Sequence, residues 1–305
     1  MKVLMISGDK NILVTGSEAH TRIELQRSQD DQLDVFVWPQ VHSFSEIFTS
    51  AKKNKYDVVT SQDPFWRGFI AWRIARRNGA KLNLQIHTDL SAQSFGRSLL
   101  ANFLLRRADS VRVVSEKIRK QIQSIGIRVP IYVLPIYVDI SRFQNLISEP
   151  HSQKIILWVG RFEKEKDPLY AIQVLEKVRA RDIDAKLIML GSGSLEASIQ
   201  KQACNLPVEL PGWQDTKQYL QIADVVLCTS KHESYGASII EALSAGVPVV
   251  APDVGIAKEA GAIIVPVSEL GDVVISVLNS DQRGVLKISL LSADEWAKRW
   301  RETLV

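Results

Sequence analysis

Short runs of apolar residues alternate along the chain with longer amphipathic segments. This pattern predicts parallel β-strands connected by helices that cover both faces of a sheet. The expected strands are 2–7, 35–37, 57–60, 82–87, 111–114 and 131–134 in the first half, and 155–159, 185–190, 225–228, 247–251 and 263–265 in the second. The fold class is therefore expected to be α/β, with a doubly wound sheet in each half.

Capping residues mark where the helices between these strands begin and end. Ser17 and Ser115 are expected N-caps, and the pairs Ser43–Glu46 and Ser292–Glu295 have the spacing of capping boxes. Between the two halves, the segment 135–151 carries no such pattern and is taken as the linker. We expect one domain over residues 1–145 and a second over residues 150–290.

Length and composition agree with two ordinary globular domains. The chain has 305 residues, of which 46% are hydrophobic and 24% charged, with two cysteines that suggest no disulfide framework. The apolar runs are too short for a transmembrane helix. The two cysteines are interpreted as free thiols, so we expect a cytoplasmic protein. Residues 1–148 hold 21 Lys/Arg and 13 Asp/Glu, a balance of +8, whereas the remainder is acidic. This basic half predicts an anionic partner. No nucleic-acid-binding motif is present, so nucleic acid is not expected.

The stretch 229–251 contains the strongest chemical signal. A polar loop with Glu233 precedes a helix whose first turn, Tyr235-Gly236-Ala237-Ser238, offers backbone N–H groups suited to phosphate. Glu241 lies further along this helix, where its carboxylate could accept two hydrogen bonds from a ribose diol. A diphosphate flanked by two polyols is a nucleotide-sugar. The bland alternative, in which Glu241 is a solvated helix residue and Glu233 a loop charge, explains the two glutamates alone equally well.

A second candidate site follows the strand 155–159. Gly160 ends the strand, and Arg161 and Lys166 stand five residues apart on the loop, as two cations could stand around a diphosphate. Acidic residues are interleaved with them, so a solvated surface loop is the simpler interpretation when this loop is considered alone.

Both stretches resemble the retaining GT-B glycosyltransferases of family 4. The first is similar to that family's E-x7-E segment and the second to its G-R-x-x-x-x-K loop, although Ser234 and Asp167 stand where glycine is commoner. The residues that fit the E-x7-E segment are Ser230, Glu233, Tyr235, Gly236, Glu241, Ala242, Ala245, Gly246, Pro248, Val249 and Val250. The resemblance implies two facing Rossmann-like domains with an interdomain cleft, and a last helix, about 292–305, that packs back on the first domain.

The resemblance also implies the roles of the site residues. Arg161 and Lys166 hold the donor phosphates, Glu233 holds the sugar hydroxyls, and Glu241 holds the ribose. His87, at the end of a strand, lies near the donor sugar and its phosphate, although a lone histidine is more often an ordinary loop residue. Gly160 ends the strand before the phosphate loop. Further expected donor contacts are Gly16, Gly191, Gly193 and Trp213, with the first turn of the helix after Glu233. The family's Gly-Gly pair is reduced here to Thr15-Gly16.

The expected activity is therefore transfer of a sugar, with retention, from a UDP- or GDP-type donor to a glycan or lipid-linked acceptor of the cell envelope. No metal and no cofactor is expected, because cations replace the carboxylate pair that would hold one. The alternatives are a nucleotide-sugar epimerase and a non-catalytic nucleotide-sugar-binding subunit. The segment 96–108, with Arg106 and Arg107, is a candidate contact with anionic membrane; a core-facing helix with a solvated basic end is the competing interpretation.

Overall fold

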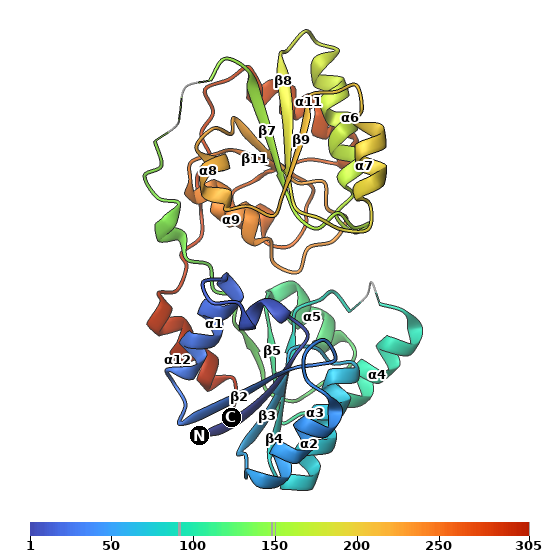
Figure 1. The fold of residues 1–305 in the computed structure, drawn as a ribbon, viewed down its shortest axis with the longest axis vertical. Coiled ribbons are helices and arrows are strands. Elements are labelled where there is room, and N and C mark those ends of the chain that lie inside the picture. Colours follow the sequence, from blue (N-terminus) through green and yellow to red (C-terminus); the bar gives the residue numbers. More distant parts are fainter. Residues whose placement is uncertain (91–92, 148, 150, 305) are drawn as a thin grey trace. The chain divides into compact units, whose positions relative to one another are not determined.

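The computed structural model describes residues 1–90, 93–147, 149 and 151–304 (Figure 1). The chain divides into two compact units. Unit 1 contains Met1–Tyr137 and Leu290–Val305, and unit 2 contains Val138–Ser289. Residues 138–145, expected in the first domain, thus belong to unit 2, because Phe143 is buried among the apolar side chains of that unit.

Unit 1 is built on a six-stranded parallel sheet in the order β2-β1-β3-β4-β5-β6. The strands are β1 (Lys2–Ser7), β2 (Gln32–Val37), β3 (Val58–Ser61), β4 (Lys81–Ile86), β5 (Ser110–Val113) and β6 (Ile131–Val133). The chain reverses its winding direction between β1 and β3. In such sheets ligands bind beyond the carboxyl ends of the strands at this point.

The helices of unit 1 are η1 (Lys10–Leu13), α1 (Glu18–Arg27), α2 (Phe44–Lys53), α3 (Trp66–Asn78), α4 (Phe95–Leu105), α5 (Glu116–Ser124) and α12 (Ala293–Glu302). The predicted caps are confirmed: Ser17 and Ser115 accept hydrogen bonds from helix amides, and both capping boxes are formed. Polar side chains inside the sheet hold the end of α12. Asn83 and Ser110 each donate to the Thr303 carbonyl oxygen at 2.8 Å, which satisfies a group that the helix itself leaves unpaired.

Unit 2 contains a second six-stranded parallel sheet, in the order β12-β11-β10-β7-β8-β9. The strands are β7 (Lys154–Val159), β8 (Ala185–Leu190), β9 (Val208–Gly212), β10 (Val225–Leu227), β11 (Val249–Ala251) and β12 (Ile263–Ile264). Counted from β7, this is the strand order of the dinucleotide-binding Rossmann fold, whose ligands bind where the order reverses. That position lies between β7 and β10.

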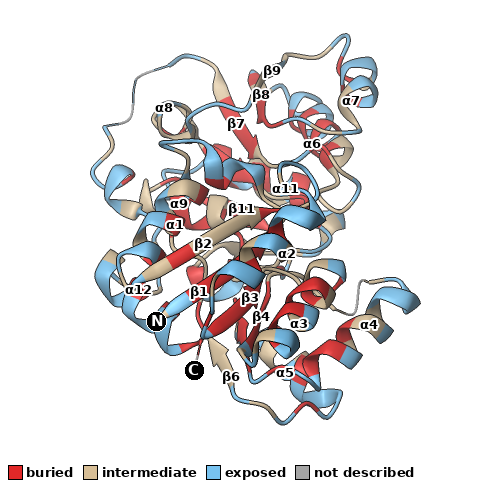
Figure 2. Ribbon diagram, turned by 60° about the horizontal axis from the view of Figure 1, so that its bottom comes forward, coloured by how far each residue is buried: buried red, intermediate tan, exposed pale blue. Residues whose placement is uncertain are grey.

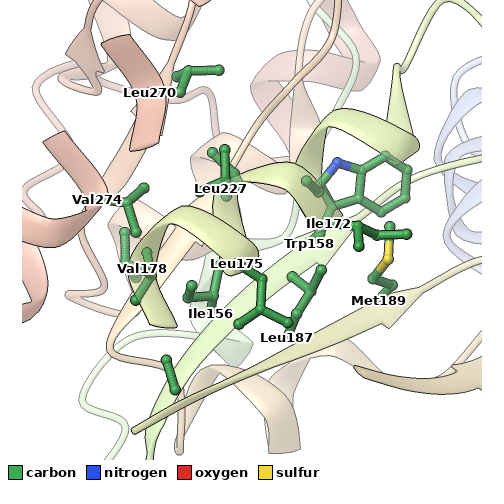
Figure 3. Close-up of a cluster of buried hydrophobic side chains, with 14 of the residues drawn as sticks. Ile156, Trp158, Ile172, Leu175, Val178, Leu187, Met189, Leu227, Leu270 and Val274 are labelled. Carbon is green, nitrogen blue, oxygen red and sulfur yellow. The ribbon is translucent and has the colours of Figure 1, made fainter. Parts of the chain in front are cut away.

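The helical elements of unit 2 are η2 (Ile140–Arg142), α6 (Pro168–Arg179), α7 (Glu196–Gln202), α8 (Thr216–Leu220), α9 (Ala237–Ser244), α10 (Ala257–Ala260), η3 (Val267–Glu269) and α11 (Leu270–Leu278). Alternate residues of β7 supply the cores on the two faces of the sheet, as the strand period requires. Ile156 and Trp158 pack with α6 and α11, as Figure 3 shows, whereas Ile155 and Leu157 face the cluster beneath α9.

Sequence reasoning missed β9. The segment contains Pro211 and pairs only with β8, with an irregular register after Ile188. Proline is tolerated on an edge strand because no second neighbour needs its missing N–H. The strand conformation of β9 is therefore determined by its pairing with β8 rather than by local sequence preference.

An ion-pair cluster at the start of β7 predicts how stability depends on pH. His151 places Nε2 2.8 Å from Asp224 Oδ2 and Nδ1 2.8 Å from the Glu149 carbonyl oxygen. Both ring nitrogens thus face acceptors, which favours the imidazolium. Burial of the ring opposes the charge, and nearby Lys154 repels it, but the bonds to Asp224 and Glu149 raise the pKa of His151 overall.

A raised folded-state pKa means that the imidazolium stabilises the protein at low pH and that this contribution is lost as the pH rises above about 6.5. We expect His151→Gln to remove a stability difference of about 1 kcal/mol or less between pH 6 and pH 8. Urea unfolding across this range measures it, with His232→Gln, an exposed loop histidine, as the control. Equal pH dependence in wild type and His151→Gln would contradict the assignment.

Candidate active site

Two loops meet at the point in unit 2 where the strand order reverses. One follows β7 over residues 160–167, and the other follows β10 over residues 228–236. They bring together Lys166 and Glu233, which are 67 residues apart in sequence and form an ion pair. The side chains are 16% and 14% exposed, so a bound ligand can reach the pair although most of it is shielded from water. Ser230 donates a further hydrogen bond of 2.8 Å to Glu233.

A buried threonine fastens the two loops together. Trp158, in β7, donates its indole N–H to the Thr229 hydroxyl at 2.9 Å. That hydroxyl in turn lies 2.8 and 2.9 Å from the carbonyl oxygens of Lys166 and Asp167, to which it donates. Because Thr229 and Trp158 are both buried, these bonds are shielded from competing water. The Thr229 hydroxyl, held by Trp158, therefore fixes the backbone of Lys166 on the opposite loop.

Asp167 stands where the resembled family commonly has glycine, and it adopts a backbone conformation that glycine favours. Its backbone has φ 47°, in the left-handed region that glycine adopts without steric cost and that Asp tolerates better than most residues. Its carboxylate pairs with Lys231 at 2.8 Å. The Asp167–Lys231 ion pair thus adds a link between the two loops.

The glycines after β7 and β8 allow a close backbone approach. A Cβ on Gly191 would lie 1.8 Å from the Gly160 carbonyl oxygen, and one on Gly193 would lie 2.7 Å from that of Phe162. Glu163 fixes the neighbouring loop by accepting hydrogen bonds from the Ser194 amide and hydroxyl, which lower the pKa of its carboxyl group. These predicted donor contacts therefore have a packing role of their own.

Arg161 does not join the Lys166–Glu233 pair. Its side chain is 63% exposed, and its guanidinium group binds Glu165, four residues further along the loop, at 2.7 Å. The structure thus brings together two of the predicted catalytic residues of unit 2 and places the third at the surface, on the same loop.

Helix α9 begins at this site. Gly236, its N-cap, has φ 100° and supplies no side-chain cap, so the first amides, those of Ala237 and Ser238, have no partner within the helix. Tyr235 is buried, and burial raises the pKa of its phenol to about 12, so the ring is uncharged at neutral pH. Without a side-chain cap, the amides and the positive end of the helix dipole are suited to an anion.

Glu241 lies inside unit 2 rather than on its surface. It is 6% exposed, and Thr216, at the start of α8, donates to Glu241 Oε2 at 3.0 Å. This burial excludes the alternative in which Glu241 is a solvated helix residue, because a glutamate is rarely buried unless it has polar partners. Trp213, just before α8, is 56% exposed and can therefore stack on a ligand.

His87 lies in unit 1, after β4. It lines a cavity of about 80 Å³ together with Asp9, Arg22, Gln62 and Arg112. Burial, with the nearby Arg112 and Arg22 guanidinium groups, lowers the pKa of His87 to about 3, so the imidazole is neutral at physiological pH. Its Nε2 atom is buried and, among the described residues, has no hydrogen-bond partner. Gly16, with φ 84°, is also in unit 1 but does not line this cavity.

Sequence reasoning missed two residues that shape these sites. Thr216 gave no signal, because its contact with Glu241 joins residues 25 positions apart. Arg112 did give one: it is a charged residue within the apolar strand β5, it is 2% exposed, and it donates to Gln85 and to the carbonyl oxygens of Leu134 and Pro135. A charge in a buried strand is rare unless it is fully paired.

Within the part of the chain that the structure describes, no group of three or more His, Cys, Asp or Glu residues is arranged to hold a metal ion. In the same residues, no helix is both long and apolar enough to cross a bilayer.

Two Rossmann-like units, each a parallel sheet covered by helices, define the GT-B fold. The same architecture is found in sucrose-phosphate synthase from Thermosynechococcus elongatus, with a TM-score of 0.75 over 100% of this chain and 95% of that one, at 16% sequence identity.

Each half of the chain also matches a family model. Residues 35–142 match "Glycosyltransferase Family 4", and residues 153–280 match "Glycosyl transferases group 1". Together with the fold, these matches support a GT-B glycosyltransferase of these families.

The curated proteins to which the chain is similar include glycosyltransferases whose names specify a lipid substrate or product. It is 30% identical over 103 residues to the GDP-mannose-dependent alpha-(1-6)-phosphatidylinositol dimannoside mannosyltransferase of Mycobacterium tuberculosis, covering 32% of this chain and 27% of that protein. It is 24% identical over 240 residues to the alpha-monoglucosyldiacylglycerol synthase of Streptococcus pneumoniae, covering 68% and 54%. The matched part of the chain therefore spans between about a quarter and about half of each relative.

Proposed function

We propose that the protein transfers a sugar, with retention of anomeric configuration, from a UDP- or GDP-type nucleotide-sugar to a glycan or lipid-linked acceptor of the cell envelope. The observation that carries the proposal is the shielded Lys166–Glu233 pair beside the uncapped start of α9, at the position where Rossmann-like sheets bind nucleotides. The relatives named for mannosyl and glucosyl transfer to lipids support the acceptor class.

The chemical step requires charge stabilisation more than acid–base catalysis. The bond between the anomeric carbon and the diphosphate breaks, and its electron pair goes to the leaving diphosphate. Lys166, the first amides of α9 and Arg161, once released from Glu165, would stabilise this charge. The acceptor hydroxyl forms the new bond on the same face and passes its proton to the leaving phosphate. This route needs no separate base.

The carboxylates have different roles in this proposal. Glu233 accepts hydrogen bonds from the donor sugar hydroxyls. In this proposal its ion pair with Lys166 holds the ammonium group beside the leaving diphosphate. Glu241, oriented by Thr216, accepts hydrogen bonds from the ribose. Trp213, Gly160, Gly191 and Gly193 border the nucleotide, and in unit 1 Gly16 and the neutral His87 are proposed contacts of the donor sugar and its phosphate.

A thermal-shift screen against UDP-, GDP- and ADP-sugars tests the donor, followed by product analysis with and without acceptors. Stabilisation by one class and transfer to an added glycolipid or glycan support the proposal. An epimerised donor formed without acceptor would instead support the epimerase alternative. Donor binding without turnover on any acceptor would support the non-catalytic subunit.

Chelation should leave the activity unchanged. We expect turnover in excess EDTA to stay close to that of the untreated enzyme, because cationic side chains and helix amides take the place of a divalent ion at the leaving diphosphate. Initial rates with EDTA, and after addition of Mg²⁺ or Mn²⁺, provide the measurement. A rate that collapses with EDTA and returns with metal would show that the cations are insufficient.

A further inference from the structure

Helices α3 and α4 of unit 1 present large apolar side chains to solvent. Phe95 is 80% exposed, Trp66 66% and Leu99 56%. The core does not require them, because α4 already buries Ala101, Leu104 and Leu105 on its other side. In α4 the outward residues Phe95, Leu99 and Phe103 are four apart and form an exposed stripe. Figure 2 shows that α4 carries both exposed and buried residues.

Aromatic contacts join the two helices into one surface. The ring centroids of Trp66 and Phe69 are 6.2 Å apart, those of Phe69 and Trp72 are 5.6 Å apart, and Trp72 meets Phe103 of α4 edge to face at 5.4 Å. We call these four residues, with Phe95 and Leu99, the α3–α4 surface.

Arginines surround this surface. Neither α3 nor α4 contains an Asp or Glu. Six exposed arginines lie on or directly after the two helices: Arg73, Arg76, Arg77, Arg97, Arg106 and Arg107. Within the described ranges, none of the six forms an ion pair with a carboxylate. Arg107 lies 3.7 Å from the Phe103 ring centroid instead.

We propose that the α3–α4 surface docks on an anionic lipid bilayer, independently of the donor chemistry of unit 2. Aromatic side chains that are apolar with a polar edge, such as Trp66, are suited to the interface between headgroups and acyl chains. Arginines whose charge is not neutralised by a carboxylate are suited to lipid phosphates. The exposed Phe95 and Leu99 combine apolar area with positive charge on two helices that contain no Asp or Glu, whereas a nucleic-acid surface would need the charge but not these two apolar side chains.

For residues 96–108, this proposal combines the membrane contact and the core-facing helix that the sequence offered as alternatives. One face of α4 packs on the core of unit 1, and the opposite face is the one offered to lipid. The arginines supply attraction over distance, and the apolar stripe supplies burial once contact is made.

Vesicle sedimentation of the purified full chain tests the proposal, with phosphatidylcholine vesicles compared to vesicles that also contain phosphatidylglycerol. We expect binding to the anionic vesicles only, and loss of most of it in 1 M NaCl, where charges are screened within about 3 Å. Arg76→Gln with Arg77→Gln should weaken binding by roughly fivefold for each arginine. Phe95→Ser with Leu99→Ser should weaken it at least tenfold.

Matched controls are Arg181→Gln and Val285→Ser, which change an exposed charge and an exposed apolar residue of unit 2. Both should bind vesicles like wild type. Thermal shifts with nucleotide-sugars should be unchanged in all variants, which separates failure at this surface from failure of the donor site. Equal binding to both vesicle types, no binding to either, or unchanged binding of the surface variants would overturn the proposal. So would a dimer in solution that Phe95→Ser and Leu99→Ser dissociate, since the occupant would then be a second copy.

Discussion

Replacement of Lys166 by alanine is expected to lower turnover by about 10²-fold or more, because it removes a charge placed to stabilise the leaving diphosphate. The Lys166 ammonium group is shielded from water and paired with Glu233, and the Thr229 hydroxyl holds the backbone of Lys166. A positioned charge of this kind acts on the transition state more than on the ground state, so the loss should fall on kcat more than on KM. Steady-state kinetics with the donor identified in the screen give both constants.

Lys164→Ala is the matched control for this prediction. Lys164 lies on the same loop but is exposed, so its loss should leave turnover within about twofold of wild type if the effect is local rather than a general loss of positive charge. Circular dichroism melting checks that Lys166→Ala folds, because Glu233 loses its partner in that variant. Near-normal turnover of the folded Lys166→Ala protein would contradict the phosphate role. Arg161→Ala separates the two cations: a comparable loss would show that Arg161 leaves Glu165 when the donor binds.

The second large effect is expected for Glu241→Ala, which should weaken binding of nucleoside diphosphates by roughly 10- to 100-fold. This corresponds to the loss of hydrogen bonds from a ribose diol to a charged acceptor, about 1.5–3 kcal/mol. A ribose contact is shared by the ground and transition states, so free UDP or GDP is sufficient as the ligand. Isothermal titration calorimetry provides the dissociation constants.

Inorganic diphosphate provides the control ligand for Glu241, because it has the phosphates but no ribose. Its affinity should be the same in wild type and in Glu241→Ala. Thr216→Val should produce a smaller loss for the nucleotide, since it removes only the hydroxyl that orients the carboxylate. Equal nucleotide affinity in wild type and Glu241→Ala would show that this glutamate does not bind ribose. Equal losses for nucleotide and inorganic diphosphate would show that the mutation disturbs the whole site.

Local sequence signals determined most of the secondary structure. β1 and β8 have the predicted bounds, and α1, α2, α5 and α12 begin at the predicted caps, because continuous apolar runs and capping serines act within a few residues. The sequence also indicated that glycines follow β7 and β8, but it did not show which atoms approach them. That Gly191 must allow for the Gly160 carbonyl oxygen follows from the pairing of β7 with β8.

Contacts between distant segments were decided by the tertiary structure. The sequence indicated Glu233 and Lys166 as separate charges on separate loops, and each had a plausible surface interpretation. They form a pair because β7 and β10 are neighbours in the sheet, an adjacency that no local pattern specifies. The same reason explains Glu241, whose burial depends on α8, and the surface formed by α3 and α4, whose joining contact is Trp72 with Phe103. Periodicity shows which side of a helix is apolar, but whether that side meets a core or remains open depends on the packing of the neighbouring elements.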